Sequence, residues 1–89
     1  MKIPSSFQLA AITWKVEEVD KLIGAYGVTY LQDNVIQVLK DLKPPQKKQT
    51  FCHELVHAIL FSMGKELPHD EQFVDAFAHY LHQYLETAK

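Results

Sequence analysis

The sequence contains no arginine, and all nine of its basic residues are lysines. Its formal net charge is −2. Proteins that bind nucleic acid usually present a basic stripe with arginine among the contacts. The only cluster of lysines is Lys40, Lys43, Lys47 and Lys48, which reads most simply as solvated surface. We therefore expect no nucleic-acid partner. A role as a transcriptional regulator has little support, because the chain has no basic recognition helix.

Cysteine and long apolar runs are also scarce. Cys52 is the single cysteine, so no internal disulfide is possible, which fits a reducing compartment. No stretch approaches the roughly 18 apolar residues of a membrane span. The segment 1–7 lacks the charged start and apolar run of a signal peptide. These features predict a soluble cytoplasmic protein with no membrane partner.

The composition indicates a folded chain of modest size. Hydrophobic residues make up 47% of the 89 residues and charged residues 22%, as in globular proteins. A chain of this length buries one core. No internal repeat or low-complexity segment divides it, so we expect a single domain over residues 1–89.

The N-terminal half has the pattern of β-strands. In the segment 9–19, apolar Ile12, Trp14 and Val16 alternate with polar residues, which is the period of a half-buried strand. Residues 1–6 read as a loose lead-in. Two further β-type runs, 28–31 and 35–39, flank a turn-forming Gln-Asp-Asn segment, and this arrangement predicts a hairpin.

The C-terminal half has the pattern of two helices. The first is expected from about Pro45 to Met63, because proline suits a first helical turn and Gly64 suits the position after the end. Apolar residues surround it almost completely, which is typical of a buried helix. The second is expected from about Asp70 to Thr87, packed antiparallel to the first across a short loop. The fold class is therefore α+β, with a small antiparallel or mixed sheet followed by two packed helices.

The first helix carries the pattern H-E-x-x-H at residues 53–57. Residues four apart lie on one face of a helix about 6 Å from each other, so His53 and His57 can bind one metal ion. Glu54 lies about 100° around the helix, where it can take a proton from a metal-activated water. Two histidines and a glutamate on a buried helix are costly unless they are paired or bind a metal. Partner-satisfied core histidines remain the alternative explanation.

The second helix offers a third ligand. Glu71 follows His57 across the short connection, and its carboxylate can reach the same metal. Two histidines, one glutamate and an open fourth position form a common catalytic zinc site. Asp75 shares the face of Glu71 and can accept the N–H of a ligand histidine, which would fix its tautomer.

These motifs resemble a known group of enzymes. The H-E-L-V-H-A sequence at 53–58, followed by E-Q-F-V-D-A-F-A at 71–78, is similar to the gluzincin pattern and most of all to the small ImmA/IrrE-like metallopeptidases of phages and mobile elements. The resemblance covers residues 45–85 well and the preceding sheet loosely. It implies a minimal zincin-like domain in the cytoplasm of a bacterial host. It also implies Zn²⁺ held by His53, His57 and Glu71, with Glu54 as the catalytic base.

Two functions follow as hypotheses. The first is a zinc metallo-endopeptidase that cleaves a protein or peptide substrate, which would pair with an edge strand beside the first helix. For that edge we select the segment 35–39, with Val35 and Gln37 as substrate-binding residues. The second is a non-catalytic module in which zinc joins the two helices. The sequence does not reveal the oligomeric state.

Several other polar residues need an assignment. Candidates for stabilising the oxyanion are Tyr26, Tyr30, His69 and Tyr80, each also explained as structural. On the first helix, Cys52 points away from the two histidines and is expected in the core. On the second helix, His82 lies about 16 Å along the axis from Glu71, too far for the same metal, and His79 is expected in solvent.

Overall fold

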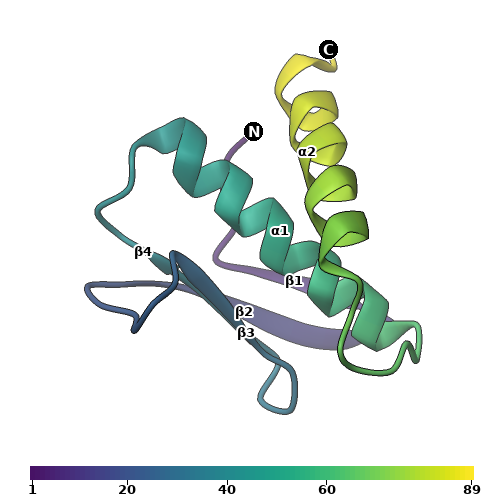
Figure 1. Cartoon of the computed structure of the whole chain (residues 1–89). Helices are drawn as coiled ribbons and strands as arrows, with labels where there is room; N and C mark the ends of the chain where they lie inside the picture. Colours follow the sequence, from purple (N-terminus) through teal and green to yellow (C-terminus); the bar gives the residue numbers. More distant parts are fainter.

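The computed structural model describes residues 1–89 as a four-stranded mixed sheet followed by two helices (Figure 1). One helix lies across a face of the sheet, and the second packs against the first helix. The expected α+β class is confirmed. The elements are β1 (Ser6–Leu9), β2 (Ile12–Val19), β3 (Gly27–Tyr30), β4 (Val35–Leu39), α1 (Pro44–Ser62) and α2 (Glu71–Thr87).

The strands lie in the order β1-β2-β4-β3. The expected hairpin is confirmed, because β3 and β4 pair antiparallel with Val28 opposite Gln37. β2 and β4 run parallel, with Val16 opposite Ile36. This parallel pair brings the N-terminal hairpin β1–β2 and the second hairpin β3–β4 into one sheet.

The expected edge strand is wrong. β4 lies between β2 and β3, so both of its sides are used for pairing, and β3 is the strand at the edge beside α1. Ile36 and Val38 are fully buried on the face under α1. Successive side chains alternate between faces, so Val35 and Gln37 lie on the opposite face of the sheet. Neither residue can contact a substrate bound between the edge strand and α1.

The start of the sheet also differs from the expectation. A single strand was expected from residue 9, but a separate strand, β1, starts at Ser6 and pairs antiparallel with β2. Phe7 of β1 stacks near Trp14, with ring centroids 6.2 Å apart. Leu9 pairs with Ile12, which leaves a two-residue turn at Ala10 and Ala11. Both turn residues have positive φ, at 49° and 65°.

The helix ends follow local rules. Proline occupies the first position of α1, and Gly64 after its end has φ 81°, a conformation that glycine adopts at little cost. Asp70 caps α2 by accepting hydrogen bonds from the backbone N–H groups of Gln72 and Phe73. Both expected helices are confirmed within one residue at each end.

The two helices pack in opposite directions. Asp75, early in α2, contacts His53 in the middle of α1. Further along α2, His82 contacts Gln49, near the start of α1, at 2.8 Å. The expected antiparallel packing is therefore confirmed, and His82 belongs to the helix interface rather than to the metal site.

The core lies between the sheet and α1 and extends to one side of α2. It contains nine buried residues: Trp14, Ile36, Val38, Phe51, Cys52, Val56, Ala58, Val74 and Ala78. The apolar stripe expected on α2 is only partly buried, because Phe73, Phe77 and Tyr84 are 47%, 49% and 65% exposed. Neither helix has the length and apolar character needed to span a membrane.

Candidate metal centre

Helix α1 places His53 and His57 on one side, one turn apart. Their ring centroids are 5.1 Å from each other. Cys52 and Val56, the neighbours of these histidines in the sequence, are buried in the core at 0% and 2% exposure. Their burial turns the side of α1 that carries His53 and His57 toward the edge of the core. The two histidine side chains are 25% and 17% exposed, so they lie at the boundary between core and solvent. A metal ion and a substrate can both reach such a position.

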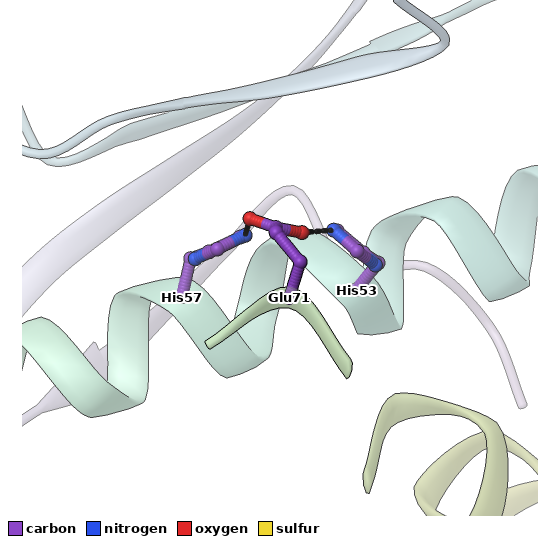
Figure 2. A group of neighbouring side chains, drawn as sticks. All are labelled: His53, His57 and Glu71. Carbon is purple, nitrogen blue, oxygen red and sulfur yellow. Dashed lines mark ion pairs between the residues drawn. The ribbon is translucent and has the colours of Figure 1, made fainter. Parts of the chain in front are cut away.

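Glu71 is the first residue of α2, and its carboxylate lies between the two imidazoles (Figure 2). One oxygen is 3.2 Å from Nε2 of His57, and the other is 3.4 Å from Nε2 of His53. One ligand atom from each of the three residues lies within 4.8 Å of the others, so the group could hold a metal ion. The cap at Asp70 fixes where the helix starts and therefore where this carboxylate is placed.

The spacing of the three residues is compatible with a bound metal ion. Ligands at 2.0–2.1 Å from a tetrahedral metal are about 3.3 Å from one another. The Glu71–histidine contacts of 3.2 and 3.4 Å are close to this value, but each involves a different carboxylate oxygen. With one ligand atom from each residue the three lie within 4.8 Å of one another, so a bound ion would draw them closer together. The donor set of two nitrogens and one carboxylate oxygen also suits zinc and leaves a fourth position open.

Asp75 holds the other nitrogen of His53. Its carboxylate oxygen lies 2.8 Å from Nδ1 of His53, one helical turn beyond Glu71. An Nδ1–H that donates to this carboxylate leaves Nε2 with a lone pair directed at the metal position. The contact expected of Asp75 is therefore present in the structure.

His69 makes the corresponding contact to His57. Nδ1 of His69 lies 2.8 Å from Nδ1 of His57, and the side chain is buried at 8% exposure. This separation fits an N–H···N hydrogen bond and is shorter than the roughly 3.3 Å between two ligands of one zinc ion. If His57 donates the hydrogen, its Nε2 is free for a metal, while the buried Nε2 of His69, which has no partner, carries a proton.

Burial lowers the pKa of His57 below its ordinary value, against the opposing effect of Glu54 and Glu71. The neutral imidazole is the form that binds a metal. Desolvation therefore keeps His57 in the metal-binding form at neutral pH.

Glu54 points from α1 toward strand β3. It is buried, at 9% exposure, and its Oε1 accepts a hydrogen bond of 2.8 Å from the hydroxyl of Thr29. Glu54 and His53 line a cavity of about 350 Å³ that also contacts Gly27 and Asp75. The cavity therefore lies between the edge strand and the two helices, beside the metal site.

The remaining candidates lie in different places. Tyr26 lines the same cavity, whereas Tyr30 lines a hollow beside Gln37 on the other side of the sheet. Tyr80 and His79 are exposed on α2. Cys52 is fully buried, as expected, and burial raises its pKa to about 11.

Sequence reasoning did not single out Thr29 or Gly27. Thr29 is one residue in a short β-type run, and Gly27 is explained as a residue of the loop before that run. The alternation of β3 places both on the face toward α1, but only the strand order shows that this face meets Glu54.

Comparison with known proteins gives one finding. Among curated proteins none matches the chain, and the same is true of solved structures. Residues 4–87 match the SprT-like family, a zinc metallopeptidase-like family of the H-E-x-x-H type. The matched region includes the whole sheet, both helices and the three residues that could hold a metal. The chain therefore belongs to the SprT-like family.

Proposed function

We propose that this protein is a zinc-dependent metallopeptidase. The observation that carries the proposal is the arrangement around α1: three ligand atoms within 4.8 Å of one another, a buried carboxylate beside them, and a cavity lined by His53 and this carboxylate. Structural zinc sites are usually closed by four protein ligands, whereas catalytic sites keep one position open. The partial exposure of the site, with Glu71 65% exposed, supports the catalytic type.

The residues have distinct roles in this proposal. His53, His57 and Glu71 would hold zinc, which when bound supplies a Lewis acid that polarises the scissile carbonyl and acidifies a water. Glu54 accepts the proton of the attacking water and passes it to the leaving amine. Asp75 keeps His53 in the tautomer that presents Nε2 to the metal.

The substrate would be a protein or peptide that binds in an extended form along β3. Tyr26 accepts a backbone hydrogen bond from Leu39, and pairing alternates along an antiparallel ladder. The backbone groups of Gly27 and Thr29 therefore point away from β4, toward the open edge. An added strand can use these groups for main-chain hydrogen bonds while its scissile bond lies next to the cavity at His53.

The resemblance of residues 45–85 to ImmA/IrrE-like enzymes bears on where the protein acts and on its origin. It favours a bacterial cytoplasm and an origin in a phage or mobile element. The absence of arginine and the negative net charge favour a protein substrate over a nucleic acid.

The replacement of Glu54 by Gln tests catalysis. We expect the purified Glu54→Gln variant to bind zinc with the same stoichiometry as the wild type but to lose cleavage of unfolded casein and of a proteome-derived peptide library, read by mass spectrometry. Persistent cleavage by this variant contradicts the assigned base. Zinc binding without cleavage in the wild type favours the second function, a module in which zinc only joins α1 and α2.

The replacement of Glu71 by Ala tests the ligand set. We expect the wild type to bind one zinc ion and Glu71→Ala to lose most of its affinity, with Glu66→Ala as a control on an exposed glutamate of the preceding loop. His69→Ala should weaken binding less, because His69 acts through His57. If Glu71→Ala keeps the affinity and His69→Ala loses it, His69 is the third ligand instead.

A further inference from the structure

We propose that Thr29 is a positioning residue that holds the carboxylate of Glu54 in its working orientation. The inference rests on the proposed function, since it concerns how the general base is aimed. It assigns a role to a residue of the edge strand that is neither a ligand nor a base.

The contact itself is specific. The hydroxyl of Thr29 lies 2.8 Å from Oε1 of Glu54 and 3.1 Å from the backbone oxygen of the same residue. A hydroxyl has one hydrogen to donate, and a charged acceptor at the shorter distance receives the larger share of it. No other hydrogen bond reaches this carboxylate. Oε2 is therefore left as the oxygen that can accept a proton.

Gly27 lies against the methylene groups of the Glu54 side chain. A Cβ at position 27 would lie 3.1 Å from Cγ of Glu54 and 2.6 Å from Cγ2 of Thr50, so the strand can approach α1 only because this residue is glycine. Gly27 thus bounds the methylene groups of Glu54, and Thr29 binds its carboxylate. Both contacts come from the face of β3 that is turned toward α1.

The position of Thr29 links the base to the proposed substrate strand. Its side chain faces Glu54, whereas its backbone groups face the open edge of the sheet. A peptide paired with that edge would be held by the same residue that aims the base. Small errors in such an alignment are costly, because a displacement of about 1 Å can slow a reaction by about 100-fold.

A purely structural role makes a different prediction. If Thr29 only ties β3 to α1, its loss lowers stability but leaves the turnover of the folded enzyme unchanged. The test must therefore separate kcat from stability, from metal binding and from KM.

The experiment compares Thr29→Val, which keeps the β-branched shape, with Thr29→Ser, which keeps the hydroxyl. Thr13→Val serves as the matched control, because Thr13 is an exposed strand threonine on β2. With zinc bound and below the unfolding temperature, we expect kcat of Thr29→Val to fall about 10- to 100-fold. KM should stay within about twofold, zinc affinity should be unchanged, and Thr29→Ser should recover most of kcat. Crystal structures of the zinc-loaded wild type and Thr29→Val should differ in the orientation of the Glu54 carboxylate.

The outcomes separate the two proposals. Full turnover in Thr29→Val, or an unmoved Glu54 carboxylate in its crystal structure, overturns the role of Thr29 while the peptidase function stands. A wild type that binds zinc but cleaves nothing refutes the peptidase function. In that case a displaced carboxylate in Thr29→Val still supports the positioning contact, and an unmoved one overturns it.

Discussion

The close approach of β3 to α1 allows a quantitative test at Gly27. An alanine Cβ there would lie 2.6 Å from Cγ2 of Thr50, well inside the 3.5–4.0 Å of ordinary carbon contacts. Overpacking of this kind costs about 1–3 kcal/mol. Replacing glycine by alanine in a strand returns about 0.5–1 kcal/mol, because the unfolded chain loses freedom. We expect Gly27→Ala to lose about 1 kcal/mol of unfolding free energy, which lowers Tm by about 4–8 °C.

A second substitution shows whether this contact is the cause. Thr50→Ser removes the methyl group that the new Cβ would meet, at a cost of no more than about 0.8 kcal/mol on its own. In the double variant with Gly27→Ala and Thr50→Ser, the loss of unfolding free energy should be smaller than the sum of the two single losses. We expect the difference, the coupling free energy, to be about 1 kcal/mol. Urea unfolding of the four proteins in the presence of a chelator measures this without a contribution from metal. Additive losses, or a Gly27→Ala variant as stable as the wild type, would refute the steric argument.

Two further predictions concern buried chemistry and metal affinity. Cys52 has its pKa raised to about 11 from 9.0 by burial, so the folded protein should react far more slowly with a thiol reagent at pH 8 than the urea-unfolded protein. The unfolded thiol ionises near pH 9 and the folded one near pH 11, so stability should fall as the pH rises between these values; equal reactivity in both states would show that the thiol is accessible. Asp75→Ala removes the acceptor of His53 Nδ1 and should weaken zinc binding about 10- to 100-fold in a competition titration with a chromophoric chelator, whereas an unchanged affinity would show that Asp75 does not orient its ligand.

Much of the fold could be predicted because its signals are local. Proline at the start of α1, Gly64 after its end and the capping residue Asp70 delimit the helices within the chain itself. The hairpin β3–β4 is also local, since its strands are joined by a short polar turn. The spacing of His53 and His57 on a helix predicts their proximity for the same reason.

The strand order could not be predicted in the same way. β4 is internal because Val16 of β2 pairs with Ile36, and this contact joins strands that are separated by the whole of β3. Apolar side chains in β2 and β4 are compatible with several partners, so the alternation pattern does not select one. The choice of edge strand, and with it Val35 and Gln37 as substrate contacts, failed at this step.

Two contacts of the site, which depend on a loop path and on the strand order, were not predicted for a related reason. His69 lies in the connection between the helices, and only the path of that loop brings it to 2.8 Å from His57. Thr29 reaches Glu54 because β3 is the edge strand. Neither His69 nor Thr29 belongs to a helical spacing pattern, whereas the ligand histidines, and likewise Glu71 and Asp75, lie four residues apart on a helix.

The turn at Ala10 and Ala11 has a consequence for how the protein can be engineered. Both residues hold a left-handed conformation, which costs an L-residue with a Cβ about 1–2 kcal/mol. An Asn-Gly pair adopts this two-residue turn readily and would recover part of that energy. The turn lies between β1 and β2, away from the edge strand that borders the metal centre. The free energy of unfolding can therefore be raised by substitutions at this turn without changing the metal centre. A more stable chain would tolerate more of the destabilising mutations that arise near the site during directed evolution.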